Sequence, residues 1–335
     1  MANHQESIPI GGCRVPHNEF RRVGATLASV AAVIASLLAF PSAMPWMIGG
    51  WILGHTLRVA RHRPGGVPLI AGLAILLVKR PHWPPSLCAL VLVIVATAVL
   101  GTLPAHIILP VRNLWRGAGT LLLWGVWLWF VCQWHSDTIC SRPLVLDKNR
   151  PVACIGDSLT SGVPPFGGYP DDLAQRLTVP VVDRGQAGIT AEQARSSLAE
   201  LVRRQPQTAV VELGGHDFLR GRSRAATRAA LVTIITTLRE ADVEVVLMEI
   251  PRGFLTDPYA GLERELARQY DLELISDSAI RQLVLFSPYA PPGMWIKRAH
   301  LSDDGLHPNA RGNAHLADRV ARTLQRMYGP EILRH

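Results

Sequence analysis

The sequence has few charged residues, and acidic ones are almost missing from its first part. Asp, Glu, Lys and Arg make up only 18% of the 335 residues, and residues 1–140 hold three acidic against ten basic side chains. Residues 141–335 hold 23 acidic and 24 basic side chains, so nearly all of the net charge of +8 belongs to the first part. There the basic residues form small clusters between apolar runs, as in membrane loops, which argues against nucleic acid as a partner.

The sequence also lacks the patterns that bind metal ions, phosphates and disulfide partners. Its five cysteines include no CxxC pair and do not cluster with histidines, so neither a disulfide framework nor a zinc site is predicted. No glycine-rich segment of the GxxxxGK type is present. We therefore expect no cofactor and no metal ion, and any chemistry must come from ordinary side chains.

Long apolar runs set residues 1–135 apart from the rest of the chain. They occupy residues 23–57, 65–78, 85–110 and 117–132, and the segment FPSAMP offers a turn inside the first run. A helix needs ~20 mostly apolar residues to cross a bilayer. The sequence therefore predicts an all-α, multi-pass membrane region with about five transmembrane helices in the lipid bilayer.

The basic residues also predict an orientation for this region. If the N-terminus is cytoplasmic, the inner segments hold most of the Lys and Arg residues, and the outer loops hold only Lys79 and Arg80. This is the bias that membrane proteins show toward the cytoplasmic side. Five spans then place everything after Cys140 outside the cytoplasm, attached to the cell membrane, whereas one span fewer would place it inside.

Residues 136–150 read as a polar linker, and residues 151–330 alternate short apolar strands with helices. The five predicted strands lie within VACIG, VPVVDRG, TAVVELGG, VEVVLMEI and LELIS. Among the helical segments between and after them, residues 190–204 begin with a capping box of Thr190 and Gln193, and Asn309 is the expected N-cap of the last helix. This alternation predicts a three-layer α/β/α sandwich around a five-stranded parallel sheet.

Polar residues follow the predicted strands at positions where they would meet. Ser158, Gly188 and His216 follow the first, second and third strands, and Asp304 and His307 precede the last helix. Ligands of such sheets bind beyond the carboxyl ends of the strands. A serine becomes a nucleophile when a base such as His307 takes its proton, and a carboxylate three residues earlier can fix the tautomer of that base. The pattern indicates serine hydrolase chemistry.

The four segments resemble, in order and spacing, the conserved blocks of the GDSL or SGNH hydrolases. They are IGDSLT with Ser158, AGIT with Gly188, GGHD with His216, and DGLHPNARG with Asp304 and His307. The segment GGYPDDLAQRL is also similar to that of small bacterial esterases and lysophospholipases of this family. The resemblance covers residues 151–328. It implies a serine esterase with Ser158, Asp304 and His307 as catalytic residues, and an oxyanion hole that includes the backbone N–H groups of Ser158 and Gly188.

Position 216 departs from this family, which has an asparagine whose amide is a third oxyanion donor. A neutral imidazole also has one N–H donor, so we expect His216 either to keep this role or only to pack beside the rim. The loop at 285–300 is rich in Pro, Gly and aromatic residues. Its Tyr289, Met294 and Trp295 are candidates for an apolar acyl-binding edge.

The leading hypothesis is a membrane-anchored serine esterase that hydrolyses lipid or acyl and acetyl esters through an acyl-enzyme. One alternative is an O-acetyl esterase or transferase acting on envelope polysaccharide, although no obvious polar site for acyl transport lies in the apolar region. Another is an inactive ligand-binding or sensory domain, in which His216 marks lost catalysis. The joint presence of Ser158, Asp304 and His307 argues against this second alternative.

Overall fold

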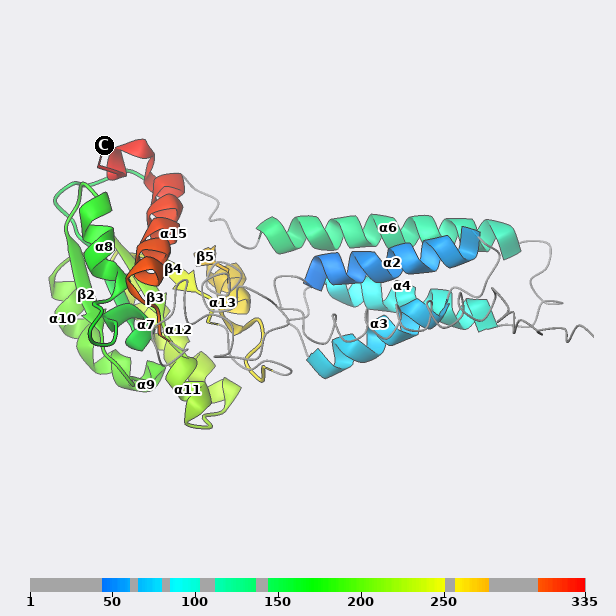
Figure 1. Ribbon diagram of the computed structural model, residues 1–335, viewed down its shortest axis with the longest axis horizontal. Helices are drawn as coiled ribbons and strands as arrows, with labels where there is room; N and C mark the ends of the chain where they lie inside the picture. Colours follow the sequence, from blue (N-terminus) through cyan, green and yellow to red (C-terminus); the bar gives the residue numbers. More distant parts are fainter. Residues whose placement is uncertain are drawn as a thin grey trace, which may run out of the picture.

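The computed structural model describes residues 44–60, 66–79, 85–102, 112–136, 144–250, 257–276 and 307–334. Figure 1 shows long N-terminal helices toward one end of the long axis and an α/β domain toward the other. The α/β domain holds every predicted site residue that lies within the described ranges.

Five parallel strands form a single sheet in the α/β domain. They are β1 (Val152–Gly156), β2 (Val181–Gly185), β3 (Thr208–Glu212), β4 (Glu244–Met248) and β5 (Glu273–Ile275), in the order β2-β1-β3-β4-β5. Gly156 at the end of β1 pairs with Gly185 of β2 and Glu212 of β3. The carboxyl ends of these three strands are therefore level with one another, and the loops that follow them start side by side. The predicted five-stranded parallel sheet is confirmed.

Helices cover both faces of this sheet. One face packs against α9 (Ala191–Ala194), α10 (Leu198–Arg203), α12 (Arg224–Glu240) and α13 (Leu262–Tyr270), and the other against α8 (Tyr169–Arg176) and α15 (Ala310–Tyr328). Successive side chains of a strand point to opposite faces. Ala153 and Ile155 of β1 accordingly enter the first apolar core, and Val152 and Cys154 the second. This layering confirms the predicted α/β/α sandwich and explains why its strands read as unbroken apolar runs.

Two short helices and one break differ from the sequence prediction. Helices α7 (Ser158–Ser161) and α11 (Gly215–Leu219) were not predicted, because four or five residues are too few to display a helical apolar period. The helix predicted over 190–204 is divided into α9, the 3₁₀ turn η2 (Arg195–Ser197) and α10. Within that turn, Ser196 and Ser197 donate to the carbonyls of Gln193 and Ala194, and such side-chain bonds compete with regular helix.

The predicted helix caps are confirmed. Thr190 and Gln193 form a reciprocal capping box at the start of α9. The side chain of Asn309 accepts a hydrogen bond of 3.1 Å from the N–H of Gly312, and α15 ends at Gly329. These caps fix the start of α9 and α15, the two helices that follow the loops of Gly188 and His307.

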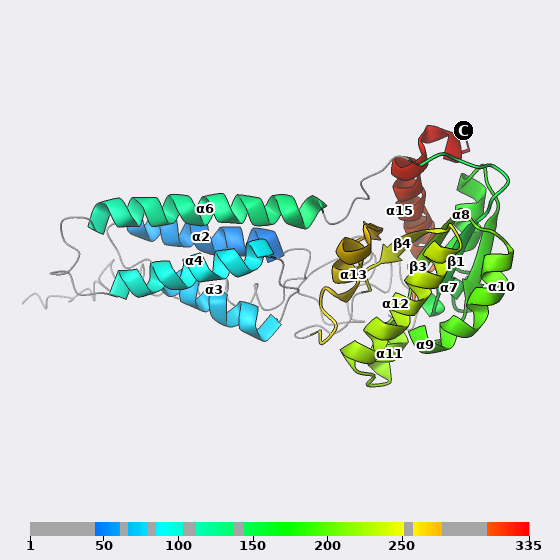
Figure 2. The same ribbon diagram turned by 180° about the vertical axis from the view of Figure 1, so that it is seen from behind.

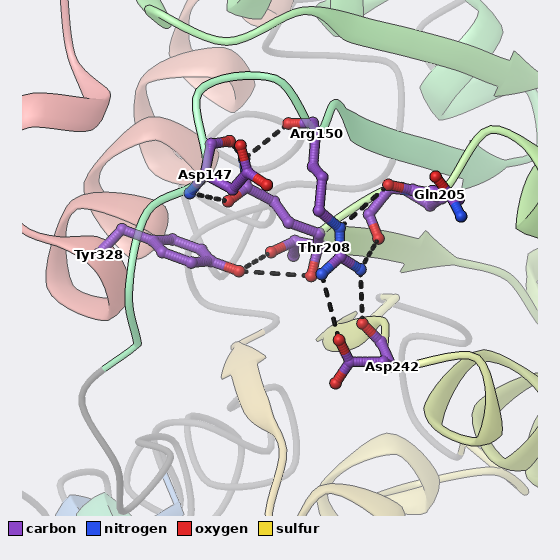
Figure 3. A network of polar contacts seen from close by, with 8 residues as sticks. Asp147, Arg150, Gln205, Thr208, Asp242 and Tyr328 are labelled. Carbon is purple, nitrogen blue, oxygen red and sulfur yellow. Dashed lines mark hydrogen bonds and ion pairs between the residues drawn. The ribbon is translucent and has the colours of Figure 1, made fainter.

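The chain enters the α/β domain at the amino ends of the strands, whereas the predicted site lies at their carboxyl ends. The guanidinium of Arg150 donates to the carbonyls of Gln205, Pro206 and Asp242 at 3.2, 2.9 and 2.7 Å (Figure 3). It also lies 3.1 Å from the Asp242 carboxylate. Because these acceptors lie just before β3 and β4, Arg150 joins the amino ends of two strands and attaches the entering segment to them.

Within the described part of residues 44–136, four helices pack side by side; each contacts the next one along the chain, and the first also contacts the last (Figure 2). They are α2 (Met44–Ala60), α3 (Gly66–Lys79), α4 (Pro85–Thr102) and α6 (Arg112–Ser136). Among the residues that the structure describes, no helix combines the length and the apolar character needed to cross a membrane. The five predicted transmembrane helices thus find no support among the described residues, and α2 and α3, with 17 and 14 residues, are also shorter than the ~20 of a span. Residues 1–43, where the first predicted span begins, lie outside the described residues.

Candidate active site

Ser158 lies at the turn between β1 and α7. At Gly156 a side chain is excluded, because a Cβ would lie 2.0 Å from Oγ1 of Thr160. Asp157 caps the helix by accepting a hydrogen bond of 3.0 Å from the N–H of Leu159. Ser158 is then the first residue of α7, where a backbone N–H has no acceptor within the helix. The turn therefore presents a hydroxyl and a backbone donor at the same point.

His307, which lies near the C-terminal end of the domain, contacts Ser158 near its N-terminal end. Its Nε2 lies 2.8 Å from Oγ of Ser158, across 149 positions of the chain. This is the hydrogen-bond distance of a serine and its general base. The prediction that these two residues share one site is therefore supported by their geometry. Asp304, Tyr289, Met294 and Trp295 lie outside the described residues, so their predicted roles stay predictions.

Gly188 lies in the loop that follows β2. This loop is attached to the end of β1, because the N–H of Gln186 donates to the carbonyl of Gly156 at 2.9 Å. Gly188 has φ of +79°, a left-handed conformation that favours glycine. Its carbonyl accepts a hydrogen bond of 2.8 Å from Arg220, which follows α11. The Gly188 loop is thus held between the first strand and the segment that carries His216.

His216 is half-buried on the first turn of α11, directly after β3. A Cβ at Gly215 would lie 2.9 Å from Oδ2 of Asp157, so α11 begins against the carboxyl group next to Ser158. The adjacent Asp217 is buried, and its carboxylate accepts a hydrogen bond of 2.8 Å from the N–H of Ala191. Asp217 thus joins α11 to the start of α9.

Residues 154–315 match the GDSL-like Lipase/Acylhydrolase family. They form a GDSL-like lipase/acylhydrolase domain. The chain is 29% identical over 211 residues to thioesterase 1/protease 1/lysophospholipase L1 of Escherichia coli (strain K12), covering 58% of this chain and 94% of that protein. It is 28% identical over 183 residues to an arylesterase of Vibrio mimicus, covering 51% and 86%.

Among solved structures, that of TesA is 22% identical with a TM-score of 0.46, and the match covers 53% of this chain and 99% of the other. The family match and the curated relatives together assign the chemistry of the GDSL-like domain. It is a hydrolase that acts on ester bonds.

The carboxyl group of Asp157 interacts electrostatically with both His216 and His307. Burial raises the pKa of Asp157, while its hydrogen bond from Leu159 and the neighbouring charges of His216 and His307 lower it in part. Both imidazoles therefore lie within electrostatic range of the same side chain. The structure places His216 with the Ser158–His307 pair on the same rim of the sheet.

Sequence reasoning missed one acidic residue of the GDSL-like domain, Glu212 at the end of β3. Its side chain is fully buried, and its Oε2 accepts hydrogen bonds from the N–H of Asp157 at 3.1 Å and the hydroxyl of Thr160 at 3.0 Å. Burial and then the charge of Asp157 raise the pKa of Glu212 well above its usual range. The sequence did contain a sign of this residue's importance, an acidic residue inside the apolar run VVELGG. A carboxyl group is almost never buried without a partner, so its presence in a buried strand indicates a specific role.

Proposed function

We propose that the GDSL-like domain is a serine esterase that works through an acyl-enzyme on Ser158. The contact of 2.8 Å between Nε2 of His307 and Oγ of Ser158 carries this proposal. As Oγ bonds to the carbonyl carbon of the ester, His307 takes the hydroxyl proton and the carbonyl oxygen becomes an oxyanion. When the ester C–O bond breaks, His307 gives the proton to the leaving alkoxide. Water then releases the acid from Ser158 by the same two steps.

Four further groups complete the proposed site. Asp304 holds the His307 ring in the tautomer whose Nε2 accepts a proton. The backbone N–H groups of Ser158 and Gly188 donate to the oxyanion, and the ring of His216 adds a third donor. Gly188 follows β2 and His216 lies on α11 after β3, and these two strands flank the strand that leads to Ser158, which supports this arrangement.

The proposed substrates are carboxylic esters or thioesters with an acyl chain. The names of the curated relatives include a thioesterase, a lysophospholipase and an arylesterase, which supports a site that tolerates different leaving groups. Tyr289, Met294 and Trp295 are proposed to border the acyl chain, because their loop immediately precedes Asp304 in the sequence.

We also propose that the N-terminal helices attach the domain to a lipid bilayer, with the domain outside the cytoplasm. This rests on the distribution of Lys and Arg and on exposed apolar side chains on the helices. The large apolar residues exposed there are Trp46, Leu53, Leu57, Ile70, Leu92, Val95, Leu121, Leu122, Leu128 and Trp129. A surface of this kind marks a contact with lipid or with another protein.

Extracytoplasmic placement would favour the alternative substrate, an O-acetylated envelope polysaccharide. The other alternative is an inactive ligand-binding or sensory domain. The contact between Ser158 and His307 argues against it, because a domain that only binds a ligand does not need its serine next to a base.

A panel of esters tests the proposed function. The purified full-length protein is assayed against p-nitrophenyl esters from acetyl to palmitoyl, an acyl thioester, a lysophospholipid and acetylated xylan. We expect hydrolysis by the natural protein and none by Ser158→Ala, whose folding is checked by circular dichroism. A folded natural protein that hydrolyses none of these substrates would favour the ligand-binding alternative.

A further inference from the structure

Glu212 is a buried acidic residue that has no part in the acyl-transfer steps. Its two hydrogen bonds go to residues on either side of the nucleophile: the N–H of Asp157, one position before Ser158, and the hydroxyl of Thr160, two positions after it. A Cβ at Gly156 would lie 2.6 Å from Oε2 of Glu212. The carboxyl group therefore packs directly beneath the turn that presents Ser158, and it connects that turn to β3.

The surroundings of Glu212 disfavour a negative charge. Its Oε1 is buried without a hydrogen-bond partner among the described residues, and no Lys or Arg of that part of the chain forms an ion pair with it. Among the described residues, Asp157 before α7 and Tyr169 on α8 interact electrostatically with Glu212; Cys154 on β1 interacts with Tyr169, and His216 and His307 interact with Asp157. Burying a carboxylate that has no positively charged partner costs several kcal/mol of folding free energy.

We propose that Glu212 is a positioning residue that stays protonated and holds the turn of Ser158 in place. This rests on the proposed role of Ser158 as nucleophile. As a neutral acid, Glu212 accepts the two hydrogen bonds without adding a negative charge behind the turn. An ionised side chain there would oppose the negative charge that develops on the ester oxygen beside the N–H of Ser158.

The first test detects the protonation state of Glu212 from the pH dependence of thermal stability, so it needs no enzyme assay. The folded-state pKa of Glu212 is raised above its ordinary 4.5. As pH rises above 4.5 the unfolded chain loses this proton while the folded chain keeps it, so the residue's contribution to stability falls. Glu212→Gln has no such proton. We expect its Tm to exceed that of the natural protein by about 4 °C or more at pH 8, and this gain to vanish near pH 5.

Glu273→Gln is the matched control for the stability test. Glu273 is also buried, but its Oε1 accepts a hydrogen bond of 2.6 Å from Arg326 in an ion pair. Its replacement by glutamine should lower Tm at pH 8, the opposite of the effect at Glu212. If Glu212→Gln also lowers Tm at pH 8, Glu212 is ionised and the proposal is wrong.

The second test measures positioning through kinetics on a short-chain ester. Glutamine keeps an acceptor oxygen for both bonds, so Glu212→Gln should hold kcat within about threefold, whereas Glu212→Leu should lower kcat about tenfold or more with little change in KM. Thr160→Val, which removes one of the two bonds, should fall between them. Equal kcat in the Leu and Gln variants would overturn the positioning role. Hydrolysis that survives in Ser158→Ala would instead refute the proposed function, and the stability test would still report on Glu212.

Discussion

At position 216 the chain has an imidazole, and α11 places that residue beside the carboxyl group of Asp157. Asp157 also precedes Ser158 and lies within electrostatic range of His307. A single carboxyl group thus faces both the proposed base and the proposed third oxyanion donor. A nearby carboxylate favours an imidazole N–H that points toward it, so a histidine in place of the usual amide is compatible with the proposed mechanism.

His216→Ala should lower kcat by about 10²–10³, or roughly 3–4 kcal/mol, with a smaller change in KM. The reason is that the proposed contact with the oxyanion forms fully only in the transition state. His216→Asn should recover much of the loss, because its side-chain amide supplies a donor. Steady-state kinetics on one short-chain ester measure both. Near-normal kcat in His216→Ala would show that the ring only fills space.

The sequence identified Ser158 and His307 because both lie in ordered motifs with a known chemical role. It did not identify Glu212, because the sequence VVELGG does not show whether the carboxyl group points to solvent or beneath the turn of Ser158. Only the register of β1 and β3, which pairs Gly156 with Glu212, brings this residue under the nucleophile. Contacts set by strand register are not encoded in any local pattern.

At the level of elements, the start of α15 decides where His307 lies. His307 comes two residues before the N-cap Asn309, whose side chain accepts from the N–H of Gly312. Asn309→Ala should lower the free energy of unfolding by about 1 kcal/mol. It should also lower kcat about threefold or more, because the histidine is positioned by this turn. Urea unfolding and steady-state kinetics measure the two effects.

Ser223→Ala is the control for this cap. Ser223 caps α12, and its side chain accepts from the N–H of Ala226. The variant should lose similar stability, and kcat should be unchanged. If the two variants have the same kcat, the cap of α15 stabilises the fold without positioning His307.

The elements that the sequence predicted are those with a long pattern or a capping signal. The five strands were visible as apolar runs, and α15 by its expected N-cap Asn309. Helices α7 and α11 were not visible, although they carry Ser158 and His216. Both begin directly after a strand, where tertiary contacts at the sheet edge rather than helix periodicity determine the backbone.

At the scale of the whole molecule, the proposed membrane attachment and its orientation can be tested together. A reporter fused after Val145, which is 94% exposed, should read as outside the cytoplasm. The reason is the excess of Lys and Arg in the segments predicted to be inside. A fusion after Arg61 should read as inside. If both fusions read on the same side, the predicted number of spans is wrong.

The whole account depends on Ser158 as the nucleophile, and covalent labelling tests this most directly. The full-length protein is treated with a fluorophosphonate, digested and mapped by mass spectrometry. We expect the added mass on Ser158 alone, no labelling of Ser158→Ala, and labelling slowed about 10²-fold or more in His307→Gln, because the base is lost. A protein that hydrolyses esters while Ser158 stays unlabelled, or that labels equally fast without His307, would contradict the account.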